Sequence, residues 1–287
     1  MCGLSNPGSL VFNITKTVSM LNNNFIFKSG KTGWIISKKQ GTKYKGIPDY
    51  PSMSPNGLFW KPDGLNLYIT DNAWDRVYHF SFSVAWDITS TMTYVGMLGV
   101  GSETGSATNG ITFSPDGIKM FVTSYGSGKI TLYNLSTAWL PSSYYSSMVQ
   151  FILPGVPTTG NVFESISFTS DGLNLYVSQR NITSKIYQYK LTVPFDLSTA
   201  TLFKDLTLAT PNVAYIKPDG THLYVLFDYS MVDYKLTTPN DVSTAVSSDT
   251  TNVISGSWST GLTFSPDGFN FYTVNSQYAQ LYSAKLA

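Results

Sequence analysis

The sequence has few of the residues on which many functional classes depend. It contains one cysteine, Cys2, and two histidines, His79 and His222, among 287 residues. A single cysteine excludes a disulfide within the chain, and a thiol so close to a terminus is expected to be functionally silent. The two histidines match no metal-ligand spacing, and neither a Gly-x-Ser-x-Gly elbow nor a phosphate-binding loop is present. The sequence therefore predicts no metal, no cofactor and no catalytic residues.

Charge is also scarce. Asp, Glu, Lys and Arg make up only 12% of the residues, and the net charge is +1. Because nucleic-acid binding needs a basic surface, no nucleic-acid partner is expected. No apolar run approaches the roughly 20 residues of a membrane-spanning helix. The first residues lack the basic and apolar regions of a secretion signal. We therefore expect neither membrane insertion nor a signal peptide.

What the sequence does contain is a repeated unit rich in aromatic residues, which make up 15% of the chain. Five segments align without gaps around an Asp-Gly turn. Their turns are separated by 48–55 residues, which is typical of the blades of a β-propeller. The segments are GLFWKPDGLNLY (57–68), GITFSPDGIKMF (110–121), SISFTSDGLNLY (165–176), VAYIKPDGTHLY (213–224) and GLTFSPDGFNFY (261–272).

Each repeat predicts four antiparallel strands. The first strand runs into the turn and the second leaves it, and a third strand with period-two alternation follows, as in residues 186–191. A linker then recurs at residues 85–90, 194–199 and 239–244 and leads to an outer strand. Four such strands form one blade, so the predicted fold class is all-β, a single β-propeller.

The sequence allows two numbers of blades, six or five. Residues 22–54 resemble a degraded hairpin followed by a short third strand at 42–46, which favours six blades with an irregular first one. Five blades with an inserted hairpin is the alternative. The last repeat ends after its third strand, so residues 10–19 are predicted to supply its outer strand and close the ring. Residues 1–8 are expected to be a flexible N-terminus and residues 9–287 the propeller domain.

The aspartates of the repeated turns are interpreted as structural. An Asp in such a turn bonds to its own backbone and the following Gly takes a positive φ, so both residues serve the turn. One turn per blade also keeps these carboxylates apart. The structural aspartates are Asp63, Asp116, Asp171, Asp219 and Asp267.

Functional residues are instead expected on the opposite face, in the loops that differ from repeat to repeat. Aromatic side chains edged with amides suit a sugar ring or a protein surface, because the apolar face binds and the amides fix the orientation. The candidate partner-binding residues are Trp74, Asp75, Tyr125, Arg180, Tyr229, Trp258 and Tyr278.

The repeat resembles a known family. The combination of F-S-P-D-G-x-x-x-[YF]-V with Y-x-Y-x-L-[ST]-x-[PA]-[FW]-D-[LI]-S-T-A, most legible at residues 110–123 and 184–200, is similar to the YVTN/WD40-like propeller repeats of tailed-phage virions. The resemblance covers residues 57–287. It implies a virion protein of the tail, fibre or capsid, assembled in the host cytoplasm in several copies. Its implied partners are other virion proteins and a glycan or protein of the host surface.

Three functions follow as expectations. The first is a non-enzymatic structural or adhesion protein of a phage particle, because the repeat type and the lack of catalytic motifs agree with it. The second is a carbohydrate-binding lectin, which the aromatic loops favour. The third and least favoured is a hydrolase on a propeller scaffold, which requires several carboxylates that converge on the central channel.

Overall fold

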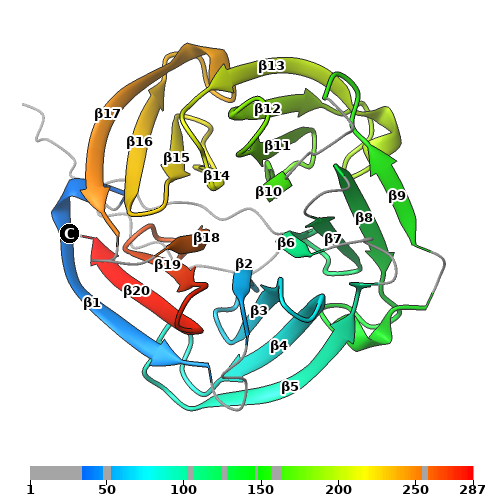
Figure 1. Ribbon diagram of the computed structural model, residues 1–287, viewed down its shortest axis with the longest axis vertical. Coiled ribbons are helices and arrows are strands. Elements are labelled where there is room, and N and C mark those ends of the chain that lie inside the picture. The colour runs from blue at the N-terminus through cyan, green and yellow to red at the C-terminus, as the bar shows by residue number, and fades with distance from the viewer. Residues whose placement is uncertain are drawn as a thin grey trace, which may run out of the picture.

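A computed structural model describes residues 34–47, 53–101, 107–124, 128–145, 148–156, 163–253 and 258–286. Within them the chain forms five four-stranded antiparallel sheets around a common centre (Figure 1). The first blade is β2 (Pro55–Trp60), β3 (Asn66–Asp71), β4 (Arg76–Phe82) and β5 (Met92–Gly99). The second is β6 (Thr108–Phe113), β7 (Lys119–Ser124), β8 (Lys129–Asn134) and β9 (Val149–Ile152). The third is β10 (Phe163–Phe168), β11 (Asn174–Gln179), β12 (Lys185–Lys190) and β13 (Thr201–Thr207).

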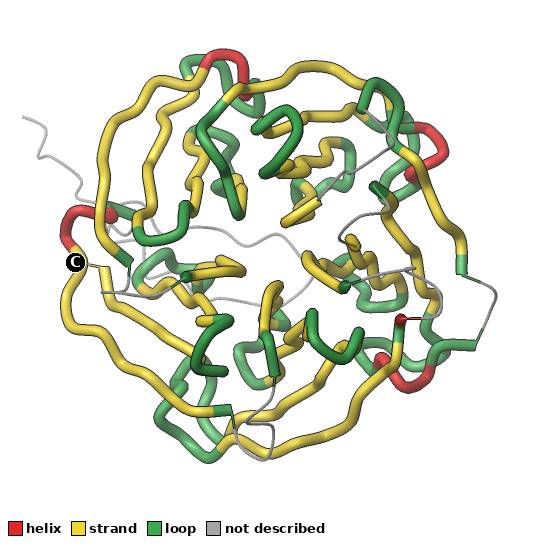
Figure 2. The backbone as a smooth tube through the Cα atoms, viewed as in Figure 1, coloured by secondary structure: helices red, strands yellow, loops and turns green. Residues whose placement is uncertain are grey.

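The remaining two sheets complete the ring. The fourth blade is β14 (Val213–Ile216), β15 (His222–Leu226), β16 (Ser230–Leu236) and β17 (Ala245–Asn252). The fifth is β18 (Ser259–Phe264), β19 (Asn270–Asn275) and β20 (Gln280–Leu286), with β1 (Lys39–Gly46) as its outer strand. Four short 3₁₀ helices, η1 (Ile36–Lys38), η2 (Pro141–Ser143), η3 (Leu197–Thr199) and η4 (Val242–Thr244), precede outer strands (Figure 2). In the described part of the chain, no helix is long and apolar enough to cross a membrane.

The single all-β propeller is confirmed, and the expectation of six blades is wrong; the five-blade alternative is confirmed. Residues 42–46, which were expected to form the third strand of an extra blade, are the second half of β1. The whole of β1 pairs with β20, from Lys39 opposite Leu286 to Gly46 opposite Gln280. This pairing gives the last sheet its fourth strand, so the two ends of the propeller are joined and no open edge remains between them.

The closing strand therefore differs from the one that the sequence predicted. A segment ahead of the first blade does close the ring, but this segment is residues 39–46. Residues 10–19, to which the prediction gave this role, lie outside the described residues, and so does the proposed boundary between residues 8 and 9. Since one outer strand fills the position, the region up to residue 54 contributes no blade of its own within the part that the structure describes.

A contact between the linker and the turn repeats in all five blades and identifies the segment ahead of β1. The linker residue has a positive φ, donates its backbone N–H to the carbonyl of the turn glycine at 2.9–3.1 Å, and lies against that glycine. The pairs are Trp86 on Gly64, Trp139 on Gly117, Phe195 on Gly172, Asn240 on Gly220 and Trp34 on Gly268. Trp34 is thus the linker residue of the fifth blade, placed at the other end of the sequence.

A second repeated contact holds neighbouring blades together. The tyrosine of the second strand donates its hydroxyl to the linker of the next blade: Tyr68 to Trp139 O at 2.6 Å and Tyr224 to Trp34 O at 2.9 Å. Across the closing seam, Tyr272 donates to Trp86 O at 2.6 Å. These hydrogen bonds satisfy carbonyl groups that the blade packing removes from water.

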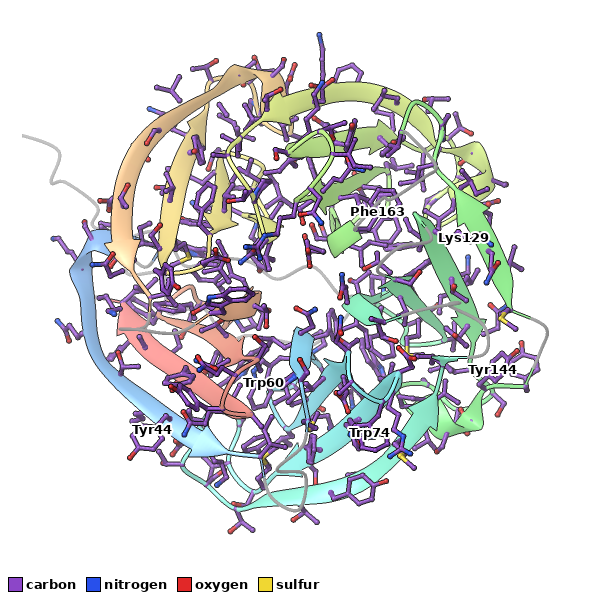
Figure 3. The ribbon with its side chains drawn as sticks, in the orientation of Figure 1. Tyr44, Trp60, Trp74, Lys129, Tyr144 and Phe163 are labelled. Atoms are coloured by element: carbon purple, nitrogen blue, oxygen red, sulfur yellow. The ribbon has the colours of Figure 1, made fainter. Side chains whose placement is uncertain are left out.

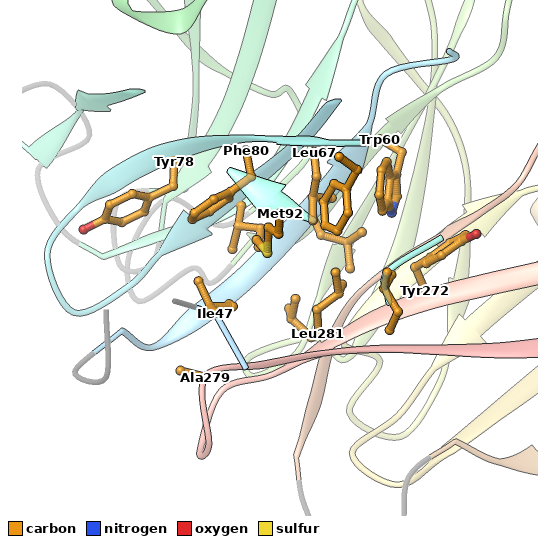
Figure 4. Close-up of a cluster of buried hydrophobic side chains, with 14 of the residues drawn as sticks. Ile47, Trp60, Leu67, Tyr78, Phe80, Met92, Tyr272, Ala279 and Leu281 are labelled. Carbon is orange, nitrogen blue, oxygen red and sulfur yellow. The ribbon is translucent and has the colours of Figure 1, made fainter. Parts of the chain in front are cut away.

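Apolar side chains fill the space between the blades. At the seam between the fifth and first blades, Leu67 and Phe80 pack with Tyr272 and Leu281 (Figure 4). Ile47, directly after β1, joins the same cluster. Figure 3 shows Tyr44 of β1 at the outer rim, while Trp60 and Phe163 lie close to the centre. The core thus continues across the seam where the two ends of the chain meet.

Candidate ligand-binding site

The centre of the propeller is a channel lined by the five inner strands, and it extends from the starts of these strands to the repeated turns. The end at the starts of the inner strands, on the side of the irregular loops, is here called the mouth. At the start of four of the five inner strands the pairing with the second strand shifts register, which marks a β-bulge. A bulge changes the direction of a side chain and is common beside functional sites. The residue ahead of each aligned repeat is Asn56, Asn109, Glu164, Asn212 or Thr260. Four of these five stand at the shifted starts, and Asn212 directly precedes β14, whose pairing has no shift.

Amide side chains connect the mouth around the ring. Asn56 Nδ2 donates to Asn109 Oδ1 at 2.6 Å. Asn109 Nδ2 in turn lies 3.2 Å from both the carbonyl of Phe163 and Oε2 of Glu164. On the other side, Asn212 Nδ2 donates to the carbonyl of Ser259 at 3.2 Å. Each of these bonds crosses from one blade to the next, so the mouth is held in one arrangement.

Glycine is required at the mouth because the inner strands approach each other closely. A Cβ on Gly57 would lie 2.3 Å from the carbonyl oxygen of Asn109. On Gly110 it would lie 2.8 Å from the Cα of Ser165. No side chain fits at such distances from backbone atoms. The glycines that open three of the aligned repeats therefore allow the backbones of five inner strands to converge.

Below the mouth, the channel has a volume of about 500 Å³. The third residue of each aligned repeat lines the channel at one level: two are aromatic, Phe59 and Tyr215, and three carry hydroxyls. The hydroxyl residues are Thr112, Ser167 and Thr263. A volume of this size is in the range of small-molecule sites, and its walls combine apolar faces with a few polar groups as such sites do.

Glu164 is the one carboxylate among the described residues that line the channel. Burial raises the pKa of this carboxyl to about 7, and the charges of Arg180 and Asp228 act on it in opposite directions. An acid that titrates near neutral pH in a cavity is a candidate functional group. In the residues that the structure describes, no group of three His, Cys, Asp or Glu side chains forms a metal site.

Beside the mouth, three loops form a patch made of Arg180, Asp228, Tyr229 and Trp258, here called the loop patch. Arg180 Nη2 and Asp228 Oδ2 form an ion pair at 2.9 Å between the third and fourth blades. The guanidinium carbon of Arg180 lies 5.5 Å from the ring centre of Trp258, and Trp258 Nε1 donates to Tyr229 OH at 3.2 Å. Asp228 Oδ1 accepts from Asn212 Nδ2 at 3.0 Å, which ties the patch to the mouth.

Both aromatic side chains of the loop patch remain accessible. Trp258 is 52% exposed and Tyr229 is 49% exposed, although both are held by contacts to neighbouring loops. The backbone N–H of Ser259 donates to the carbonyl of Asp228, and that of Val253 to the carbonyl of Tyr229, both at 3.0 Å. Exposed rings on an anchored backbone lose little freedom when a ligand binds.

The structure brings together three of the residues predicted from sequence, Arg180, Tyr229 and Trp258. Trp74, Asp75 and Tyr278 belong to other loops, and among the described residues no hydrogen bond, ion pair or ring contact joins them to the loop patch. Trp74 is 55% exposed and stacks with Arg76, and Tyr278 is 56% exposed. Asp75 has a φ of 51° in its loop. Tyr125 lies outside the described residues.

Sequence reasoning missed Glu164, Asp228 and the asparagines of the mouth. The sequence feature that could have indicated Glu164 and the asparagines is the position directly ahead of the aligned segments, where the repeats have Asn, Asn, Glu, Asn and Thr. In the turns on the opposite face, the aspartate Oδ1 atoms accept the backbone N–H two residues on at 2.8–3.1 Å. These aspartates are Asp63, Asp116, Asp171, Asp219 and Asp267.

No protein-family model matches the chain, and no curated protein matches it either. Among solved structures it is similar to a functionally unknown protein from Desulfotomaculum acetoxidans, with 13% identity and a TM-score of 0.49, over 81% of this chain and 82% of that one. It is also similar to the Cps50 (Swd1) β-propeller domain from Myceliophteria thermophila, with 7% identity and a TM-score of 0.46, over 82% and 71%.

A third similar structure is the periplasmic gluconolactonase PpgL from Pseudomonas aeruginosa. The identity is 16% and the TM-score 0.45, over 73% of this chain and 57% of that one. Similarities at this level assign neither an activity nor a ligand to this chain.

Proposed function

We propose that this chain is a non-enzymatic β-propeller that binds a host-surface glycan through the loop patch and is displayed in several copies on a phage particle. The observation that carries the binding role is the pair of exposed rings, Trp258 and Tyr229, held together by a hydrogen bond of 3.2 Å. A sugar binds by laying an apolar face of its ring on an aromatic side chain while nearby polar groups bind its hydroxyls. Arg180 and Asp228 are such groups.

Display on a particle is supported by the resemblance of the repeat to propellers of tailed phages. Several copies on one particle would compensate for weak single contacts, since linked sites bind with an avidity far above that of one site. The expected partners are neighbouring virion proteins and the host glycan, and assembly would take place in the host cytoplasm. Mass spectrometry and immunogold labelling of purified particles test this part, and absence of the chain from them would refute it.

A glycan array with the protein coupled to multivalent beads tests the binding role. The variant Trp258→Ala should abolish the hits, because it removes the central ring of the loop patch. Trp74→Ala is the matched control, since Trp74 is equally exposed and also stacks with an arginine, at 5.7 Å from Arg76, but lies in the first blade. An array without hits, or equal loss in both variants, would contradict the proposal.

Binding is better supported than hydrolysis by the same geometry. Glycoside hydrolysis uses two carboxyl groups across the scissile bond. The described lining of the channel offers one carboxyl, Glu164. Asp228 lies in the loop patch, paired with Arg180 at 2.9 Å, and is not among the described residues that line the channel.

A further inference from the structure

The channel below the mouth is a site separate from the loop patch. We propose that it binds a small organic ammonium ion, with the charge against the Glu164 carboxylate and the apolar body against Phe59 and Tyr215. The proposal does not depend on glycan binding or on display by a particle. It rests on the geometry of the channel, the position of Glu164 in the repeat and the sum of the charges around it.

Glu164 stands where the repeat otherwise places neutral residues that join the blades. At this position Asn109 donates to the carbonyl of Phe163 at 3.2 Å, and Thr260 donates to the carbonyl of Pro55 at 3.0 Å. A carboxylate has no proton to donate to the next carbonyl, so Glu164 cannot make this bond. Burial of its charge also costs stability, which is common for residues that serve a function. The third blade thus departs from the repeat in favour of a buried acid.

Among the residues that the structure describes, the charges at the mouth favour one positively charged ligand. The charged groups that act on Glu164 are Arg180, from the loop between β11 and β12, and Asp228, from the loop between β15 and β16. Arg180 and Asp228 neutralise each other in their ion pair at 2.9 Å. Together with ionised Glu164 the three groups sum to −1. At the far end of the channel Lys217 is paired with Asp219 at 2.8 Å, which adds no net charge.

The walls suit the body of such a ligand. Phe59 and Tyr215 line the same level of the channel as the hydroxyls of Thr112, Ser167 and Thr263. The apolar body of the ligand would pack against these two aromatic residues while its ammonium group pairs with Glu164. Within the described part of the chain Glu164 accepts one side-chain hydrogen bond, from Asn109 Nδ2 at 3.2 Å, so its carboxylate retains acceptor capacity for an ammonium group. An anion would be repelled here, and a neutral alcohol would gain nothing from the charge.

Calorimetric titration with benzylammonium chloride tests the proposal, with benzyl alcohol as the neutral ligand of the same shape. At pH 8 the ammonium should bind and the alcohol should bind at least about tenfold more weakly. Glu164→Gln keeps the size and the acceptor for Asn109 but removes the charge. It should weaken the binding of benzylammonium about ten- to a hundredfold and leave the alcohol unchanged.

Two further measurements locate the site. Thr263→Phe fills the middle of the channel and should abolish binding of both ligands. For the wild type, binding of benzylammonium should weaken more than about tenfold from pH 8 to pH 5.5, because Glu164 becomes protonated while the amine stays charged. The proposal is overturned by equal affinity for the two ligands, by unchanged affinity in Glu164→Gln, or by no binding at millimolar concentration.

Discussion

The buried acid of the channel makes a quantitative prediction about stability. The pKa of Glu164 is about 7 in the folded protein, against 4.5 for an unburied glutamate. Folded protein therefore binds more protons than unfolded protein between these values, so this group makes stability fall as the pH rises from 4.5 to 7. The difference of about 2.5 pKa units corresponds to about 3 kcal/mol. Glu164→Gln should recover this free energy of unfolding at pH 8 and match the wild type at pH 4.

Urea unfolding of both proteins from pH 4 to pH 8 measures the difference. At pH 8 the variant should be about 3 kcal/mol more stable, which for a protein of this size corresponds to a rise in Tm of about 6 °C. His79 works in the opposite direction, because burial lowers its pKa to about 4 and its contribution is lost as the pH falls from 6.5. Both proteins contain His79, so its effect cancels in the difference between them.

The pKa itself is accessible by NMR. Glu103 and Glu164 are the only glutamates of the sequence, so selective ¹³C labelling of glutamate carboxyls gives two signals, which Glu164→Gln assigns. Asp87→Asn is a control for which the change in stability at pH 8 should have the opposite sign, since hydrogen bonds from Thr89 lower the pKa of that exposed carboxyl. It should reduce stability at pH 8 slightly. Equal stability of Glu164→Gln and the wild type at pH 8, or a Glu164 signal that titrates near 4.5, would refute the reasoning.

Three substitutions test the contacts that repeat around the ring, each by chemical denaturation. Gly64→Ala places a Cβ 2.3–2.5 Å from the ring of Trp86 at a φ of +72° and should cost about 3 kcal/mol, whereas Gly41→Ala, with φ +47° and open space, should cost about 1 kcal/mol. Trp34→Ala removes the fifth-blade linker ring and should cost about 3–5 kcal/mol; a loss below 1 kcal/mol would mean that this segment does not close the propeller. Tyr68→Phe leaves a carbonyl of the next blade without its donor and should cost about 1–2 kcal/mol, and an unchanged midpoint would contradict the seam assignment.

Part of the fold could be predicted because its causes are local. A Pro-Asp-Gly turn between two aromatic strands needs only neighbouring residues, so each of the five segments reveals its hairpin by itself. The period of the repeat then predicts blades, since such hairpins bury their faces only against copies of themselves. The loop patch was predicted in part for the same reason, because Trp258, Tyr229 and Arg180 stand in loops that depart from the repeat.

The contacts that close the ring join residues far apart in the sequence. Residues 34–46 and 280–286 lie at opposite ends of the sequence, and their pairing follows from the space that the other blades leave open. The segment WIISK at 34–38 does resemble the linkers, but its turn glycine is Gly268, so no neighbouring residue identifies it. Without that link, the same residues resembled part of an additional blade, which produced the wrong expectation of six.

The sequence by itself determined the repeating unit, the all-β class and the division into a regular and an irregular face. Only the tertiary structure decided the blade number, the closing strand and the charge in the channel. The reason is physical: hairpins and turns form from contacts within a few residues, whereas the position of Glu164 acquires meaning only when five inner strands converge. A single glutamate at the start of a strand is ordinary, but Glu164, buried at the mouth of a shared channel, has a pKa raised to about 7.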